Sequence, residues 1–240
     1  MKITILTLFP EMFNGFLDTS IIKKARLKEL VDYQIVDIRA FTDDKHKRVD
    51  DYPFGGGQGM VMFCQPIVDA LKTVRSEESH TILMTPAAST FSQEKARSLL
   101  KFKHLIIICA HYEGYDERIL NYVDEVISIG DYILTGGELA AMVVADATTR
   151  LVDGVITQDS HLNESFEEGL LEYPQYTRPT EFQGHKVPSV LLSGHHEQIR
   201  IYRLKESLRK TYQFRKDLLA KKVLDKEAEK LLAEIMLESE

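Results

Sequence analysis

Short apolar runs of strand-forming residues alternate with helix-like segments through the first 150 or so positions, and this alternation constrains the fold most. The runs expected to form strands cover residues 3–8, 33–37, 81–84, 105–109 and 125–129. The segments expected to form helices cover residues 21–30, 66–74, 92–100, 116–122 and 138–148. Such alternation is typical of a mostly parallel sheet covered by helices on both faces. We therefore expect an α/β domain.

Glycine is concentrated at two places in this region. Four of the 13 glycines lie within five positions, at Gly55, Gly56, Gly57 and Gly59, and a second glycine-containing stretch covers residues 130–137. Glycine serves where φ must be positive or where a ligand or another chain approaches the backbone closely. The two stretches indicate a binding site built largely from loops, although a long turn or a subunit contact would make the same demand at the first of them.

The first glycine cluster does not match the common nucleotide-binding loops. A Walker-type loop needs Lys followed by Ser or Thr after its last glycine, whereas Gly59 is followed by Met60 and Val61. A Rossmann-type turn leaves a hydrophobic strand directly, and residues 49–53 do not form one. The cluster is therefore interpreted as a site of close backbone approach outside a Rossmann turn.

Three loops follow predicted strands directly, at residues 86–88, 110–114 and 130–137. In open parallel sheets, ligands bind beyond the carboxyl ends of the strands. The three loops are therefore expected to converge on one crevice.

The chain changes character after Gly154. Residues 157–165 are polar and without periodicity, which is typical of a mobile linker. Beyond them, apolar residues recur at helical spacing over residues 195–212 and 225–236. The expected organisation is a first domain over residues 1–156, a flexible linker over residues 157–168 and a small α-helical domain over residues 169–240.

Charge is segregated along the chain. The formal net charge is −7, yet nine basic residues face only two acidic ones between positions 200 and 222. The basic residues are Arg200, Arg203, Lys205, Arg209, Lys210, Arg215, Lys216, Lys221 and Lys222, and the acidic ones are Glu206 and Asp217. This basic strip fits a phosphate-binding surface and a solvated helix face about equally well.

The remaining sequence features bear on location. Cys64 and Cys109 have no metal-ligand spacing, and Cys109 ends an apolar run where a buried, inert thiol is expected. The apolar N-terminus is too short for a secretory signal and is interpreted as a core strand. No stretch approaches the length needed to span a bilayer. We therefore expect a cytoplasmic protein that does not enter membranes.

Several long motifs resemble those of the bacterial tRNA (guanine-N1)-methyltransferases that modify position 37, and the match runs nearly end to end. These motifs lie at residues 8–13, 49–60, 111–118, 130–139 and 172–179. The resemblance implies a catalytic domain that binds S-adenosylmethionine, a sheet with a deep trefoil knot, and a helical domain that binds the tRNA anticodon stem-loop. It also implies a homodimer with active sites at the interface. A knot does not follow from composition or periodicity.

Methylation of guanine at N1 needs a base for the N1 proton and a cation for the charge that develops toward O6. The family places an aspartate before a Ser-Phe pair in the linker, and this position is Glu164 here, before Ser165 and Phe166. The resemblance therefore implies Glu164 as the base, with Asp159 and Glu167 as nearby substitutes. A solvated acid in a polar linker is the alternative interpretation. Arg150 matches the catalytic arginine of the family, although a basic residue in a last helical turn also complements the helix dipole.

The resemblance also carries the cofactor site onto this sequence. The implied S-adenosylmethionine-binding residues are Pro86, Ala110, Tyr112, Glu113, Gly114, Ile129, Gly130, Asp131, Tyr132, Ile133, Leu134, Gly136 and Gly137. Ala110 stands where the family has a glycine, so a tolerated methyl group or a small backbone shift is expected there.

The candidate RNA-binding residues fall into two groups, since phosphates attract Arg and Lys and exposed base edges need polar partners. Asp50, Asp51 and Gly59 are candidates for the base pocket, and Arg178, His195, Arg200, Arg203 and Arg209 for the anticodon stem. The family implies dependence on Mg²⁺, but no cluster here has the spacing of a metal site. Two alternatives stay open: another knotted RNA methyltransferase, acting on ribose 2′-OH or on rRNA, and an RNA-binding relative without catalysis.

Overall fold

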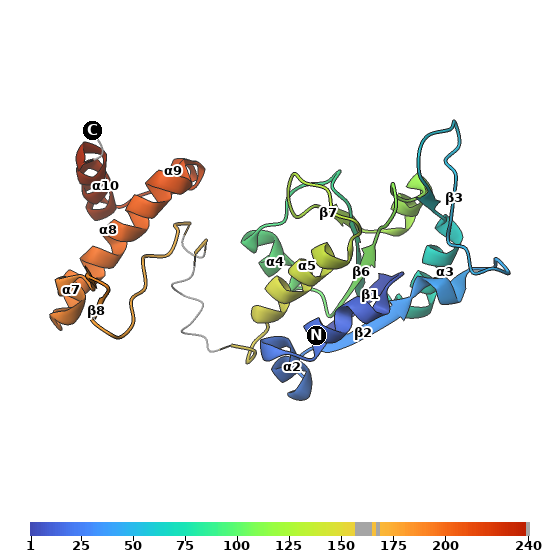
Figure 1. The fold of residues 1–240 in the computed structure, drawn as a ribbon, viewed down its shortest axis with the longest axis horizontal. Coiled ribbons are helices and arrows are strands. Elements are labelled where there is room, and N and C mark those ends of the chain that lie inside the picture. The colour runs from blue at the N-terminus through green and yellow to red at the C-terminus, as the bar shows by residue number, and fades with distance from the viewer. Residues whose placement is uncertain (157–164, 167–168, 239–240) are drawn as a thin grey trace. The chain divides into compact units, whose positions relative to one another are not determined.

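The computed structural model describes residues 1–156, 165–166 and 169–238. The chain divides into two compact units, Met1–Ile156 and Thr157–Glu240 (Figure 1), and the division falls where the polar stretch begins. Each unit is described by itself below.

The first unit is built on a five-stranded sheet in the order β2-β1-β6-β5-β7. All four pairings between neighbouring strands are parallel. The strands are β1 (Lys2–Thr7), β2 (Asp32–Asp37), β5 (Ser79–Met84), β6 (His104–Cys109) and β7 (Glu125–Ile127). The predicted α/β architecture with a parallel sheet is confirmed.

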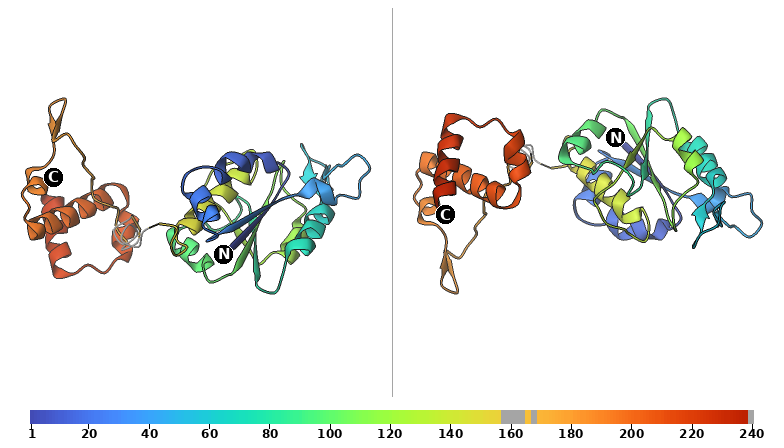
Figure 2. Two further views of the ribbon diagram at one scale, coloured as in Figure 1. Left: turned by 90° about the horizontal axis from the view of Figure 1, so that it is seen from below. Right: turned by 90° about the horizontal axis from the view of Figure 1, so that it is seen from above.

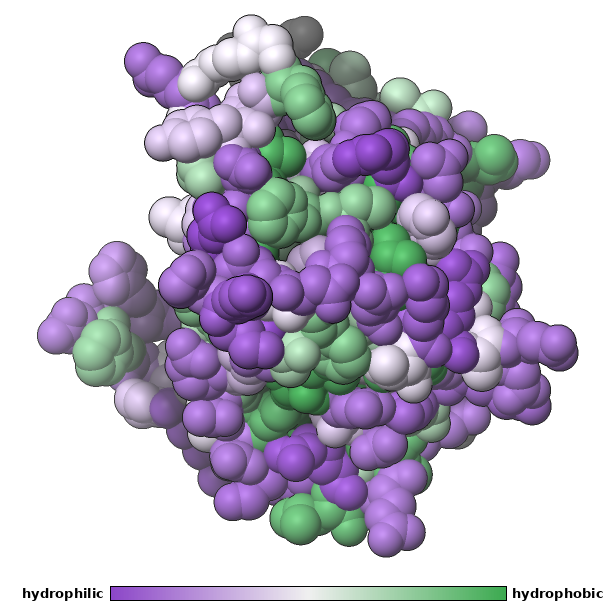
Figure 3. Space-filling view, turned by 90° about the vertical axis from the view of Figure 1, so that its right-hand side faces the viewer, coloured by the Kyte–Doolittle hydropathy of each residue, from purple (hydrophilic) through white to green (hydrophobic). Residues whose placement is uncertain are grey.

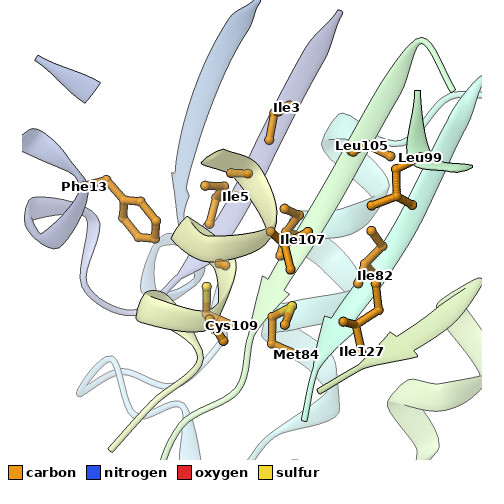
Figure 4. Close-up of a cluster of buried hydrophobic side chains, with 14 of the residues drawn as sticks. Ile3, Ile5, Phe13, Ile82, Met84, Leu99, Leu105, Ile107, Cys109 and Ile127 are labelled. Carbon is orange, nitrogen blue, oxygen red and sulfur yellow. The ribbon is translucent and has the colours of Figure 1, made fainter. Parts of the chain in front are cut away.

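The sheet carries a hydrophobic core on each face, because successive side chains of a strand point to opposite sides. On one face, Ile5, Ile107 and Ile82 belong to a cluster drawn in Figure 4. On the other, Leu6 and Ile108 belong to a second cluster. All six residues of the central strand β6 are buried, which explains its unbroken apolar sequence.

Helices cover both faces, as Figure 2 shows. The first face receives η1 (Pro10–Phe13), α1 (Asn14–Leu17), α2 (Ser20–Leu27), α4 (Gln93–Leu99) and α5 (Glu138–Arg150). The second face receives η2 (Ile38–Phe41), α3 (Cys64–Val74) and η3 (Glu117–Tyr122). The segment expected to be a helix at residues 116–122 is a 3₁₀ helix, which begins after Asp116 caps it by accepting a hydrogen bond from the Arg118 backbone N–H.

The first glycine cluster lies between two short antiparallel strands that sequence analysis missed, β3 (Asp50–Asp51) and β4 (Val61–Met62). The four glycines of the cluster all have positive φ, between +79° and +143°. The cluster is therefore the tip of a long loop closed by a two-residue ladder, and two-residue strands are too short for periodicity to reveal.

The second unit is a small helical bundle with a β-hairpin. Its helices are α7 (Ser189–Leu192), α8 (His196–Phe214), α9 (Lys216–Lys221) and α10 (Lys226–Glu238), and β8 (Glu181–Phe182) pairs antiparallel with β9 (His185–Lys186). Leu208 of α8 and Ile235 of α10 are completely buried in its core. Sequence periodicity found α8 and α10, whereas the hairpin, α7 and α9 are too short to give a periodic signal.

Candidate functional site

A cavity of about 540 Å³ opens at the carboxyl ends of β5, β6 and β7. These three strands are neighbours in the sheet, so the loops that leave them meet at one edge. The lining residues are Met84–Ala87, Ala110–Tyr115, Glu117, Ile127–Gly130, Tyr132–Gly137 and Ala140. The predicted convergence of the three loops on one crevice is thus observed.

Backbone hydrogen bonds fix the three loops to one another. The N–H of Gly137 donates to the carbonyl oxygen of Ala110 over 2.7 Å, which joins the end of β6 to the start of α5. The N–H of Ser128 donates to Ser89 over 3.1 Å, and the N–H of Phe91 donates to Ser128 over 2.7 Å. The chain leaving β7 therefore lies against the β5–α4 loop and then against the end of β6. The cavity wall is preformed by main-chain bonding.

Gly137 lies directly against the backbone at the end of β6. A Cβ atom placed on it would lie 2.9 Å from both the Cys109 Cα and the Ala110 nitrogen. Its φ of −78° is open to any residue, so space alone demands glycine here. The methyl group of Ala110 is partly buried and packs against the second core cluster, so the departure from glycine is accommodated in the core.

A buried polar cluster borders the cavity and was missed by sequence analysis. Glu138, in the first turn of α5, has a side chain only 2% exposed. The Thr7 hydroxyl donates to Glu138 Oε1 over 2.9 Å, and His111 Nδ1 lies 3.6 Å from Glu138 Oε2. Among the described residues, Nδ1 of His111 has no hydrogen-bond partner. An acid directly after a glycine pair at a helix start was the available signal, because carboxylates favour helix N-termini.

The sequence-based cofactor set and the cavity lining overlap closely. Twelve of the thirteen predicted residues line the cavity, and Asp131 does not. Asp131 is exposed in the turn that the Tyr132 N–H closes by donating to the Gly130 carbonyl oxygen. The lining residues that were missed are Met84, Thr85, Ala87, His111, Tyr115, Glu117, Ile127, Ser128, Thr135 and Ala140. Most of them flank predicted ones along the chain.

The glycine loop meets the cavity through Gly59. The N–H of Glu113 donates to the carbonyl oxygen of Met60 over 3.1 Å, beside Gly59. A Cβ on Gly59, whose φ is +81°, would lie 2.3 Å from Glu113 Cγ. Asp50 and Asp51 lie in β3 at the base of the same loop. The surface seen in Figure 3, which brings this end of Figure 1 toward the viewer, is mostly hydrophilic with small separate hydrophobic patches.

Of the two candidate catalytic residues, the structure describes only Arg150, which lies away from the cavity residues described so far. Arg150 is the last residue of α5, whereas the cavity lies at the N-terminal end of this helix. Arg150 is thirteen residues beyond Gly137, and at 1.5 Å per residue the two are about 20 Å apart along the helix. Burial raises the pKa of Asp146, one turn before, and the charge of Arg150 opposes this shift. Glu164, and its substitutes Asp159 and Glu167, lie outside the described residues.

The candidate anticodon-stem residues differ in their surroundings. Arg200 forms ion pairs with Glu197 and Glu227, each over 2.8 Å, and Arg209 pairs with Glu206 and Glu238. Arg178 and Arg203 instead line a second cavity, of about 460 Å³. His195 is exposed at the start of α8.

Within the described part of the chain, neither the thiols nor a search for metal clusters or membrane-spanning helices gives a further candidate. Burial raises the pKa of Cys64 and raises that of the completely buried Cys109 further. Over residues 1–156, 165–166 and 169–238, no three His, Cys, Asp or Glu side chains are grouped to hold a metal ion. In the same ranges, no helix has both the length and the apolar character to cross a membrane.

Comparison with known proteins identifies the family. Residues 1–221 match the model of the family described as tRNA (Guanine-1)-methyltransferase TrmD. Proteins named tRNA (guanine-N(1)-)-methyltransferase are 53% identical in Dictyoglomus turgidum, over 99% of this chain and 98% of that protein, and 51% identical in Halalkalibacterium halodurans, over 100% of both. Another, from Geobacillus kaustophilus, is 56% identical over 91% of each chain. A cavity at three adjacent strand ends, on a chain with such relatives, places this protein in the tRNA (guanine-N1)-methyltransferase family.

Proposed function

We propose that this chain transfers the methyl group of S-adenosylmethionine to N1 of guanine at position 37 of tRNA. The observation that carries the proposal is the cavity at the ends of β5, β6 and β7, which is lined by twelve of the thirteen residues that the family resemblance assigns to the cofactor. Its volume of about 540 Å³ lies in the usual range of small-molecule sites.

The residues present fit this cofactor. Main-chain groups from Ile129 to Leu134 and from Ala110 to Gly114 are held by hydrogen bonds within the wall, so they are preorganised to bind an adenine ring and ribose. When bound, the cofactor supplies an electrophilic methyl group on a positively charged sulfur. The exposed Glu113 carboxylate lines this wall and favours a cationic ligand.

Catalysis in this proposal uses Glu164 to take the N1 proton and Arg150 to stabilise the charge at O6. Within one chain, Arg150 lies about 20 Å along α5 from Gly137. A second copy must therefore bring its arginine toward the cavity, which is the reason to propose a homodimer with active sites at the interface. Leu139 and Val143, one turn apart on α5, are 50% and 47% exposed, as expected of a face that another subunit covers.

We also propose that the sheet contains a deep trefoil knot. The chain leaving β7 is bonded to Ser89 and Phe91 on one side and to Ala110 on the other before α5 begins. α5 then packs on the sheet beside β1 and β6. A knot requires that the chain be threaded through an earlier part of itself. A segment held between two earlier loops in this way meets that requirement.

The RNA would be held by the glycine loop and by the helical unit. Tyr52 and Phe54, which come just before the first glycine cluster, have exposed aromatic rings that suit stacking on unpaired bases. Asp50 and Asp51 are proposed to contact the target guanine, which must leave its stack to react. The residues proposed to bind the anticodon stem-loop are Arg178, His195, Arg200, Arg203 and Arg209. The protein is proposed to act in the cytoplasm with Mg²⁺.

The test is transfer of labelled methyl groups to two anticodon-matched tRNA transcripts, with guanine or adenine at position 37, followed by identification of the nucleoside. N1-methylguanosine from the first transcript alone is the expected result. A 2′-O-methylated product would support the alternative knotted methyltransferase. Cofactor binding without transfer to either transcript would favour the RNA-binding relative that lacks catalysis.

A further inference from the structure

The second unit contains a cavity of its own that the chemistry above does not use. It has a volume of about 460 Å³ and lies between the extended segment 173–180, α7 and α8. The lining residues on which the argument depends are Tyr173, Tyr176, Arg178, Leu191, Ile199 and Arg203. The lining thus combines aliphatic side chains with aromatic rings and guanidinium groups.

The two arginines of this cavity differ from other basic residues of α8 and its neighbours. No described acidic side chain lies within ion-pair distance of Arg178 or Arg203. By contrast, Lys205 pairs with Glu234 and Glu238 at 3.0 and 2.9 Å, and Arg215 pairs with Asp217 at 2.7 Å. Lys205 and three of the four arginines of the basic strip, Arg200, Arg209 and Arg215, are thus paired within the unit. Uncompensated positive charge is left at the cavity, where it would attract an anion.

The aromatic rings are placed for stacking. The guanidinium carbon of Arg203 lies 4.8 Å from the ring centroid of Tyr173, so its planar group extends the stacking surface. Tyr176 is 47% exposed.

We propose that this cavity binds one unstacked nucleotide of the RNA, with its phosphate on Arg178 and Arg203 and its base against Tyr176. A stem phosphate alone would need charge but neither a cavity nor a ring. Single-stranded RNA is recognised by bases that stack on aromatic side chains and guanidinium planes. The inference rests on the proposed function for the identity of the RNA, and it adds a nucleotide site separate from the cavity at the sheet edge.

The test uses the full-length protein and a fluorescent anticodon stem-loop RNA, titrated by anisotropy at several salt concentrations. Tyr176→Ala should weaken binding by roughly 5- to 150-fold, the range of 1–3 kcal/mol for one base–aromatic stack. Arg203→Ala should also weaken binding and reduce the slope of log K against log salt by about 0.7–0.9, as loss of one phosphate contact does. Arg215→Ala is the matched control, because its charge is already paired; its affinity should stay within about twofold.

Arg203→Lys separates charge from stacking. It should keep the salt slope yet lose affinity, because an ammonium group offers no planar surface. A 2-aminopurine at the bound nucleotide, found by scanning the loop positions, should be quenched in the wild-type complex and recover in Tyr176→Ala. Circular dichroism and thermal unfolding of each variant show whether the helical unit stays folded.

Three results would overturn the inference. Equal weakening by Arg203→Ala and Arg215→Ala would mean a diffuse basic surface. Unchanged RNA affinity in Tyr176→Ala would mean that no base binds there. A lower unfolding midpoint in Tyr176→Ala and Arg203→Lys, with unchanged RNA affinity, would mean that these side chains stabilise the folded unit and do not bind RNA. Failure of the proposed function is distinguishable, since the wild-type protein would then bind no RNA or transfer no methyl group, whatever these variants do.

Discussion

Replacement of Gly137 by alanine tests the packing that forms the cavity wall. The added Cβ would lie 2.9 Å from the Ala110 nitrogen, 2.9 Å from the Cys109 Cα and 3.3 Å from the Ala110 oxygen. All three atoms belong to the backbone of a buried strand end, so no flexible side chain can move aside. The backbone of α5 must shift, and the 2.7 Å bond from the Gly137 N–H to Ala110 is strained or lost.

The magnitude follows from three contributions. Overpacking costs about 1–3 kcal/mol, and the weakened hydrogen bond costs about 1 kcal/mol. The lower entropy of the unfolded alanine chain returns about 0.4–1 kcal/mol, because the native φ of −78° suits alanine. The net loss of unfolding free energy is roughly 1–3.6 kcal/mol. At about 2–4 °C per kcal/mol for a unit of this size, the unfolding midpoint should fall by about 2–14 °C.

The assay is calorimetric unfolding together with titration of S-adenosylmethionine, whose affinity should fall because Ala110 and Gly137 both line the cavity. Gly15→Ala is the matched control, since a Cβ there meets nothing within 4 Å and the residue is helical. It should be neutral or stabilise the protein by up to about 1 kcal/mol. If Gly137→Ala matches this control in both measurements, the steric argument is wrong.

The other predictions concern buried polar groups. Thr7→Val removes the hydroxyl that donates to Glu138, so the unfolding free energy should fall by about 1–3 kcal/mol in urea titrations, whereas Thr7→Ser should lose only about 1 kcal/mol for its methyl group. Burial lowers the pKa of His104 below its ordinary 6.5, so its contribution to stability is complete above pH 6.5 and is lost as the pH falls through the folded pKa. His104→Gln should flatten this dependence of unfolding free energy on pH, and an unchanged slope would contradict the assignment. A thiol reagent should modify Cys64 slowly in the native protein and Cys109 only after denaturation, because burial raises both pKa values and Cys109 is 0% exposed; labelling followed by peptide mass analysis distinguishes them.

The local pattern of apolar residues was enough to predict the longer strands and helices, in which this pattern extends over many residues. The strand β6 is buried on both faces, so its sequence is an unbroken apolar run, and this composition predicts a central strand. The helices α3, α5, α8 and α10 each span three or more turns, which is long enough for a 3.6-residue period to appear. The hairpin of β8 and β9 escaped because two-residue strands have no period.

Some features of the candidate site could likewise be predicted from the sequence, and others could not. Loops after consecutive strands could be assigned to one sheet edge from chain order, because parallel strands end on the same side. The partnership of Thr7 with Glu138, 131 positions apart, could not be foreseen, since it depends on α5 returning to the sheet beside β1. The surroundings of Arg203 and Arg200 could not be told apart either, because ion pairing depends on which acids the folded chain brings near.

The sequence by itself determined the α/β class, the parallel sheet and the family, because these depend on local periodicity and on long ordered motifs. Only the tertiary structure decided that Gly137 must lack a side chain for reasons of space and that a buried carboxylate borders the cavity. It also decided that the uncompensated arginines of the second unit line a cavity. The physical reason is that steric exclusion, burial and charge pairing are properties of atoms distant in the chain, and only folding sets the distances between them.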